Sequence, residues 1–445
     1  MYKRFTACVA LFAALALFAA SVSSARQGTP SIAKPDAALS STDEILKVVS
    51  RLRELDIKQS VKSSFKSKDE IEQSVIKDLD ENTPAEEFEA TQKTLVKLGL
   101  ISRSFRLRDY VVKLLREQVA GFYEPKTKEF YLAAWLPISD QKRVMAHELV
   151  HALQDQHFNL RRFEKWPKGD SDAELAAHAL VEGEATLVMI QYDFDQQGLK
   201  LDMSKIGSLT DALSDQDGDK SNQEGDKDAK TYPVFANAPR VLKENLQFPY
   251  FYGAAFVGAM LKNRSWKLLD RSYERLPAST EQIMHPERYL TPDNPVVIDI
   301  PDLSGALGPN WRKTDADVNG EFGYLVALAE FIPRPAARIA AAGWGGDRYS
   351  LYENKATAEL VLVQYTTWDS EKDAQEFFNA YSQRTVKRYN LNKPAGADVQ
   401  TRIYETDEGL ASIELRGKDV VMIEGARTRE QLARLSEQAW RSKKR

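Results

Sequence analysis

The chain has 445 residues, of which 43% are hydrophobic, and this length and composition can build two or three globular domains. Its 61 basic and 65 acidic residues are mostly interspersed and give a net charge of -4, which argues against a nucleic-acid partner. The single cysteine, Cys8, lies near the N-terminus, so disulfides and thiolate chemistry are excluded from the rest of the chain.

The N-terminus is typical of a secretory signal peptide. Basic residues precede an apolar run from Phe5 to Ala20, and Ser23 and Ala25 supply the small side chains that a signal peptidase needs. The run is shorter than the roughly 20 residues that span a bilayer, which favours cleavage over a membrane anchor. We therefore expect residues 1–25 to be removed, with no stable membrane insertion afterwards. The protein should be extracytoplasmic, either periplasmic or secreted.

Residues 26–100 form the next expected unit. The first part, to about residue 40, is rich in Ser, Pro and Ala and is typical of a leader without regular structure. From Thr42 to Leu98, charged and apolar residues alternate at helical spacing, which predicts two or three amphipathic helices. The unit is either a removable prosegment or an integral helical cap, and the sequence leaves both alternatives open.

A hairpin and a helix open the next expected domain, residues 101–335. The stretch "EQVAGFYEPKTKEFYLAAW", residues 117–135, has two aromatic runs that flank a turn beginning at Pro125. A helix should follow, capped by Ser139 or Asp140 and continuing through the segment "MAHELVHALQDQHF".

A second long helix is predicted from Ser171 or Asp172 to about Gln197, across "DAELAAHALVEGEATLVMIQYDF". After it, the stretch "DALSDQDGDKSNQEGDKDAK", residues 211–230, is nearly devoid of apolar side chains, which is typical of an acidic mobile insertion over about 205–232.

The C-terminal residues 340–445 have a different pattern. A strand is predicted over 356–368, a helix over 370–389, two strands that turn at Gly417, and a final helix. This order predicts a small α+β domain after the larger one. The expected fold class is therefore α+β and mainly helical.

The segment "MAHELVHALQDQHF", residues 145–158, carries the residues that indicate chemistry. On a helix His147 and His151 lie about 40 degrees apart, so both imidazoles point to one side, one turn apart. Glu148 lies on the same flank, where its carboxylate reaches a water activated by a metal rather than the metal itself. The opposite face is apolar and can pack on the core. The spacing predicts a site for one zinc ion.

A catalytic zinc needs a third protein ligand, and the second long helix offers the candidates. Glu182 and Glu184 lie about 200 degrees apart on a helix, so only one of them can face the metal. Gly183 removes a side chain where two helices must approach closely, which favours Glu182. His178 and Glu184 remain alternatives, although His178 is also typical of a hydrogen-bonded histidine between helices.

Two more polar residues of the first helix are assigned different roles. Asp155 lies one turn beyond His151 and can accept the second N–H of that imidazole, or it can simply be solvated. His157 lies off the face of the two candidate ligands, and we interpret it as structural.

These motifs resemble a known family. "HELVH", followed 31 residues later by "EGEA", is similar to the gluzincin zinc metallopeptidases. The strings "EQVAGFYEPKTKEFYL", "ALVEGEAT" and "STEQIMHPERYL" resemble a group of secreted bacterial HExxH metallopeptidases of unknown substrate, over roughly residues 110–345. The resemblance implies a gluzincin-like core with a two-helix zinc site and a small sheet. It also implies zinc at His147, His151 and Glu182, with Glu148 as general base.

The resemblance has further implications and one departure. Thermolysin-like members have an aspartate where this chain has Thr186, so His178 or Asp155 would have to replace that partner of the first histidine. His285 or Tyr289, in "MHPERY", would donate to the transition state. The strand that ends the hairpin would be an edge strand along the cleft, where a peptide substrate could pair.

The sequence therefore predicts a zinc-dependent peptidase that acts on a peptide or protein substrate. A non-catalytic secreted module that binds zinc, with its binding surface on residues 340–445, is one alternative. It is less favoured because structural zinc sites are closed by four protein ligands, usually including cysteines. A zinc hydrolase acting on another kind of bond is the second alternative.

Overall fold

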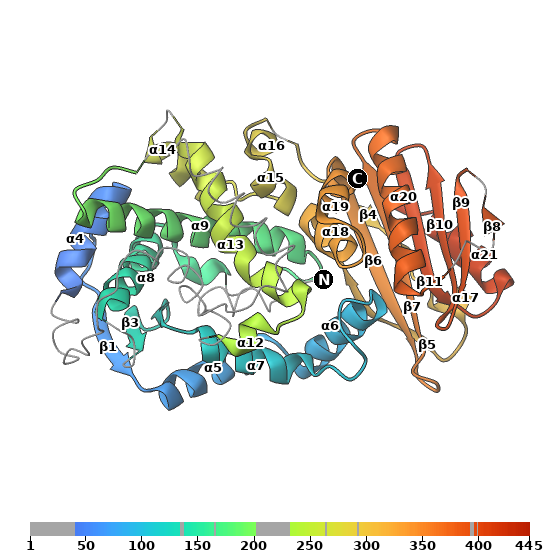
Figure 1. The fold of residues 1–445 in the computed structure, drawn as a ribbon, viewed down its shortest axis with the longest axis horizontal. Coiled ribbons are helices and arrows are strands. Elements are labelled where there is room, and N and C mark those ends of the chain that lie inside the picture. Colours follow the sequence, from blue (N-terminus) through green and yellow to red (C-terminus); the bar gives the residue numbers. More distant parts are fainter. Residues whose placement is uncertain are drawn as a thin grey trace.

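The computed structural model describes residues 41–133, 138–163, 166–201, 232–262, 265–291, 293–391, 396–397 and 399–445. The fold is α+β, as the sequence predicted, with helices gathered in one half and a large sheet in the other (Figure 1). The expected signal peptide and nearly all of the acidic insertion lie outside the described residues. None of the described helices is long and apolar enough to cross a membrane.

The N-terminal residues form three helices, as predicted over 42–98, and one strand that was not predicted. These elements are α4 (Thr42–Arg53), β1 (Lys62–Lys66), α5 (Lys68–Asn82) and α6 (Ala85–Lys97). Ser67 caps α5 in a capping box with Glu70. Helix α4 packs against the two long helices of the next region, and its Arg53 is fully buried. This helix is therefore part of the core.

The predicted hairpin is confirmed by β2 (Gly121–Glu124) and β3 (Glu129–Ala133), which pair antiparallel after helix α7 (Leu107–Gln118). The expectation that β3 is an edge strand is wrong. Strand β1 pairs parallel with β3 on its other side, so the sheet order is β1-β3-β2. Strand β3 is central because the N-terminal region contributes a strand that the sequence pattern did not reveal.

The two predicted long helices are present as α8 (Ile138–Phe158) and α9 (Ser171–Gln196). Asp170 caps α9 by accepting a hydrogen bond from the Ala173 backbone N–H. Short elements complete this half: the 3-10 helices Leu160–Phe163 and Arg271–Tyr273, and the helices α12 (Pro233–Ala236), α14 (Trp266–Asp270), α15 (Thr280–Met284) and α16 (Pro286–Leu290).

Helix α13 (Arg240–Leu261) crosses α9 with the two backbones in contact. A Cβ atom on Gly183 would overlap the backbone carbonyl group of Gly253, and a Cβ on Gly253 would overlap the carbonyl of Ala179. Gly183 thus permits a close helix approach, as expected, but its partner is α13 and not the HExxH helix α8. The crossing fixes which residues of α13 face Glu182.

The C-terminal half is a seven-stranded antiparallel sheet in the order β5-β6-β7-β11-β10-β9-β8. Its strands are β5 (Trp311–Asp317), β6 (Trp344–Asn354), β7 (Leu360–Trp368), β8 (Gly396–Ala397), β9 (Thr401–Thr406), β10 (Gly409–Arg416) and β11 (Asp419–Ala426). The boundary expected at 335–340 falls inside this sheet, because β5 precedes it and pairs with β6. The short β4 (Ile298–Asp299) also pairs with the C-terminal β12 (Lys443–Lys444).

Helices cover both faces of this sheet. Alternate residues of one strand point to opposite faces: Val361 and Val363 join one apolar cluster, and Leu362 joins the other. Helices α17 (Ser304–Leu307) and α21 (Arg429–Ala439) pack on the first face. Helices α18 (Gly320–Ala329), α19 (Arg334–Ala341) and α20 (Glu371–Arg388) pack on the second, where the core continues into the helical half (Figure 1).

Candidate metal centre

Helices α8 and α9 bring three predicted ligand residues together. His147 Nε2 lies 3.2 Å from Glu182 Oε2, and His151 Nε2 lies 3.4 Å from the same oxygen. The two Nε2 atoms are 3.1 Å apart. All three side chains are buried. We call these residues the His–His–Glu cluster.

The geometry of the His–His–Glu cluster suits a metal ion. Zinc bonds of about 2.0–2.1 Å in a tetrahedral arrangement place neighbouring ligand atoms about 3.3 Å apart. The observed separations of 3.1 to 3.4 Å match this edge length. Among the described residues, this is the group of His, Cys, Asp and Glu side chains whose ligand atoms lie close enough together to hold a metal.

The electrostatics of the cluster also indicate a place for a cation. Burial lowers the pKa of His147 to about 4. Burial by itself would raise the pKa of Glu182, but the two neighbouring imidazoles outweigh it and lower this pKa to about 2. For His151, the Glu182 carboxylate overcomes burial and raises the pKa to about 9. A cation bound here would compete with protons for these three groups.

Glu148 lies beside the cluster with one oxygen held and the other unused. Its Oε2 accepts a hydrogen bond of 2.9 Å from the Tyr123 backbone N–H, which the hairpin supplies. Its Oε1 is buried and has no hydrogen-bond partner within the described part of the chain. Burial raises the pKa of Glu148 to about 8. This carboxyl can take up or release a proton near neutral pH.

The partner of His151 is Gln154, and the predicted role of Asp155 is wrong. His151 Nδ1 lies 2.8 Å from Gln154 Oε1. The Asp155 carboxylate instead accepts hydrogen bonds from the Tyr123 hydroxyl at 3.0 Å and from the Leu160 backbone N–H at 2.9 Å. The sequence interpretation did not anticipate that the hairpin offers Asp155 a donor of its own.

His147 has no comparable support. Its Nδ1 and the hydroxyl of Thr186 are both buried without a hydrogen-bond partner in the described residues. Thr186 stands where the resemblance calls for an aspartate. The two histidines of the cluster therefore have unequal surroundings.

The alternative third ligands lie outside the His–His–Glu cluster. Glu184 pairs with Arg53 at 2.5 Å and accepts from the Tyr273 hydroxyl at 2.7 Å. His178 is buried one turn before Glu182, and burial lowers its pKa to about 4. Its Nε2 is buried and has no hydrogen-bond partner among the described residues.

The remaining predicted residues form hydrogen bonds with groups outside the His–His–Glu cluster. His285 Nε2 lies 2.9 Å from Glu321 Oε1, and the Tyr289 hydroxyl donates to the Arg275 carbonyl at 2.7 Å. Within the described residues, neither side chain forms a hydrogen bond to the His–His–Glu cluster. His157 is outside the cluster as predicted, 2.8 Å from the Asp56 carbonyl oxygen.

Tyr250 of α13 is the aromatic residue that sequence reasoning missed. Its ring centroid lies 6.2 Å from that of His147, and its hydroxyl hydrogen-bonds to Glu182. Burial raises the pKa of Tyr250 well above its ordinary value. The sequence feature that could have identified Tyr250 is the pair of glycines at 183 and 253. Contact between these glycines brings Tyr250, one helical turn before Gly253, close to Glu182.

One family matches part of the chain. Residues 309–436 match a domain of unknown function (DUF8575). This range coincides with the seven-stranded sheet and lies outside the helices that carry the His–His–Glu cluster. No curated protein and no solved structure matches the chain.

Proposed function

We propose that the protein is a secreted or periplasmic zinc-dependent peptidase of the gluzincin type. One zinc ion would be held by His147, His151 and Glu182, and the substrate would be a peptide or protein. The observation that carries the proposal is the convergence of three lone-pair donors at tetrahedral spacing, beside a buried glutamate with a free oxygen.

A bound zinc ion would supply Lewis-acid polarisation of the substrate carbonyl and would make water more acidic. Glu148 Oε1 takes the proton of the attacking water and later delivers it to the leaving amine. The Tyr123 N–H holds the other oxygen of Glu148 and so fixes the direction of the free one. Tyr250 offers a hydroxyl beside Glu182, which is the kind of donor that a tetrahedral oxyanion needs.

The substrate would lie along strand β2. The Tyr123 N–H points away from β3 toward Glu148, so this side of β2 faces the proposed catalytic residues. An extended peptide can add to such a strand by main-chain hydrogen bonds, which gives affinity with little selection for sequence.

The presence of Glu148 favours a catalytic zinc site over a purely structural one. A buried carboxyl with a single hydrogen bond costs free energy, which a catalytic role would account for. A structural site is closed by four protein ligands, whereas the His–His–Glu cluster provides three. With zinc held by three protein ligands, a fourth position would stay open for a reacting group.

The test combines metal analysis of the purified protein with an unbiased peptide-cleavage profile. We expect Glu148→Gln to retain zinc and to lose about 10²–10⁴-fold in activity, because it removes the general base. His151→Gln should lose both zinc and activity. His157→Gln, on the same helix but outside the cluster, is the matched control and should keep both.

The proposal fails if zinc-loaded protein cleaves no peptide and Glu148→Gln behaves identically. Stoichiometric zinc without peptide cleavage would then point to a binding module. Hydrolysis of esters or other amides, with the same dependence on Glu148, would point to a zinc hydrolase of another bond.

A further inference from the structure

A chain of buried polar groups runs from His151 to the N-terminal helix α4. His151 Nδ1 lies 2.8 Å from Gln154 Oε1, and Gln154 Nε2 donates to the Tyr273 hydroxyl at 3.0 Å. The Tyr273 hydroxyl donates to Glu184 Oε2 at 2.7 Å, and Arg53 Nε donates to Glu184 Oε1 at 2.5 Å. The chain thus joins elements that lie far apart in the sequence.

The chain is shielded from solvent along its whole length. The side chains of Arg53 and Glu184 are fully buried, and Gln154 and Tyr273 are at most 1% exposed. The ring of Tyr273 stacks on Phe158, with centroids 4.0 Å apart. Because water cannot substitute for a lost partner here, each group depends on the next one.

The chemistry of the groups fixes the direction of every hydrogen bond. Arginine can only donate and a carboxylate can only accept, so the hydroxyl proton of Tyr273 goes to Glu184. The Tyr273 oxygen must then accept from Gln154, which fixes the amide nitrogen on that side. The Val181 carbonyl confirms this orientation, since it also accepts from Gln154 Nε2 at 3.0 Å.

The orientation of Gln154 decides the tautomer of His151. With its nitrogen used on Tyr273 and Val181, Gln154 presents its oxygen to the imidazole. His151 Nδ1 must therefore carry a proton, so the neutral imidazole has its lone pair on Nε2, the atom that faces His147 and Glu182. Only this tautomer can ligate a metal through Nε2.

We infer that the chain Arg53–Glu184–Tyr273–Gln154 sets the tautomer and orientation of His151, so that Arg53 is a positioning residue of the metal centre. The inference rests on the proposed function in that it takes the His–His–Glu cluster as the metal site. By this inference, helix α4 supports the metal site through Arg53. Removal of residues 42–53 would leave the Glu184 carboxylate buried without its cation.

The first test measures zinc affinity by competition with a chelator, on the full chain. Outer partners of metal ligands typically contribute about 10–100-fold in affinity, and we expect a loss of this size for Gln154→Leu. Gln156→Leu, on the same helix and bonded to residues 58–59, is the matched control and should bind zinc as the wild type does.

Arg53→Met alone leaves Glu184 buried and unpaired and can prevent folding, so the double variant Arg53→Met/Glu184→Met is used. Tyr273→Phe interrupts the chain with the smallest change of shape. Both should weaken zinc binding by about tenfold. Arg51→Met, which removes an exposed ion pair from the same helix, should leave zinc affinity unchanged.

The second test reads the tautomer directly, in the metal-free protein, from the ¹⁵N chemical shifts of the labelled histidines. At a pH above the His151 pKa of about 9, where its imidazole is neutral, we expect wild-type His151 to be protonated on Nδ1 and Gln154→Leu to show a mixture of tautomers. Folded Gln154→Leu and Tyr273→Phe with wild-type zinc affinity and a wild-type tautomer would overturn the inference. Wild-type protein that binds no zinc would instead defeat the proposed function, and the tautomer measurement would still decide the role of the chain.

Discussion

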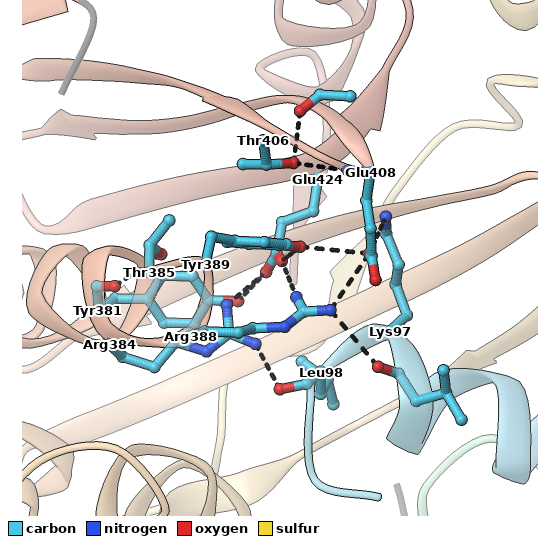
Figure 2. A network of polar contacts seen from close by, with 12 residues as sticks. Lys97, Leu98, Tyr381, Arg384, Thr385, Arg388, Tyr389, Thr406, Glu408 and Glu424 are labelled. Atoms are coloured by element: carbon cyan, nitrogen blue, oxygen red, sulfur yellow. Dashed lines mark hydrogen bonds and ion pairs between the residues drawn. The ribbon is translucent and has the colours of Figure 1, made fainter. Parts of the chain in front are cut away.

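The protein contains two buried clusters of charged side chains that are built in opposite ways. In the His–His–Glu cluster, three groups point their lone pairs at one another, at 3.1 to 3.4 Å. In the second cluster, which we call the charged network, cations surround each carboxylate (Figure 2). The charged network consists of Lys97, Arg384, Arg388, Glu408 and Glu424.

The charged network links the two halves of the molecule. Arg384 and Arg388 of α20 reach Glu424 at 2.9 and 2.5 Å, while Lys97 of α6 reaches Glu408 at 2.9 Å. Arg384 also donates to the Leu98 carbonyl at 2.6 Å, and so completes the C-terminal end of α6 (Figure 2). Both oxygens of Glu408 and of Glu424 accept hydrogen bonds, so these carboxylates need no added ion.

The difference indicates how a cluster that could hold a metal can be distinguished from a network of ion pairs among buried charges. A network in which cations surround each carboxylate links the elements that carry it. Removing any one member is costly, because a buried charge is then left without its partner. Within the described residues, the His–His–Glu cluster has no such set of cationic side chains, and under the proposed function a metal ion would complete it. The predictions below test this contrast, beginning with the largest expected effect.

Removal of a charge from the network should be costly. We expect Glu424→Ala to lower the free energy of unfolding by about 3–5 kcal/mol, because two buried arginines lose their carboxylate. Denaturant unfolding measures this loss, and zinc affinity should not change. Glu405→Ala is the control, since it removes an exposed ion pair with Arg429 and should cost at most about 1 kcal/mol. Equal losses in the two variants would refute the contrast.

The His–His–Glu cluster should respond to metal in the opposite way. Zinc at about 100 times its dissociation constant should raise the free energy of unfolding by about 2.7 kcal/mol, and a chelator should reverse the gain. Glu182→Gln should abolish the response, because the third ligand is lost. Thermal unfolding with and without zinc provides the measurement. A Glu182→Gln variant that zinc still stabilises would remove Glu182 from the site.

The charged network should also weaken in acid. Burial by itself raises the pKa of Glu424, but Arg384, Arg388 and Lys97 outweigh it and lower the pKa from 4.5 to about 2. A carboxylate with a lowered pKa stabilises the fold above its unfolded pKa, and this stability is lost as the pH falls through the window from 4.5 to about 2. By about pH 3 the loss from this residue should reach about 2 kcal/mol.

Unfolding by urea across this pH range tests the acid effect. Glu424→Gln should show a correspondingly flatter dependence on pH than the wild type, since it has no group to protonate at this position. An identical slope in the two proteins would show that Glu424 is not the residue responsible.

A helix cap at the far end of α20 from the network should have the smallest effect. Ser370 accepts a hydrogen bond from the Asp373 backbone N–H at the start of α20, the helix that carries both arginines. Ser370→Ala should cost about 1 kcal/mol, measured by denaturant unfolding. A loss as large as that of Glu424→Ala would mean that the position of α20, rather than the matched charges, dominates the network.

Local patterns in the sequence predicted the local features well. The hairpin turn, the extents of α8 and α9, and the face shared by His147 and His151 all follow from side-chain periodicity and capping residues. Features that depend on a distant partner were missed or misassigned. Asp155 bonds to the hairpin, and β3 lies inside its sheet because β1 pairs with it.

The sequence by itself therefore determined that two imidazoles and a glutamate share one helix face, because 3.6 residues per turn is a property of the local backbone. Only the tertiary structure decided that Glu182 completes the cluster, that Tyr250 and Gln154 surround it, and that Arg53 supports it from α4. These contacts depend on how helices cross, and crossing is set by close packing between residues far apart in the chain, such as Gly183 and Gly253.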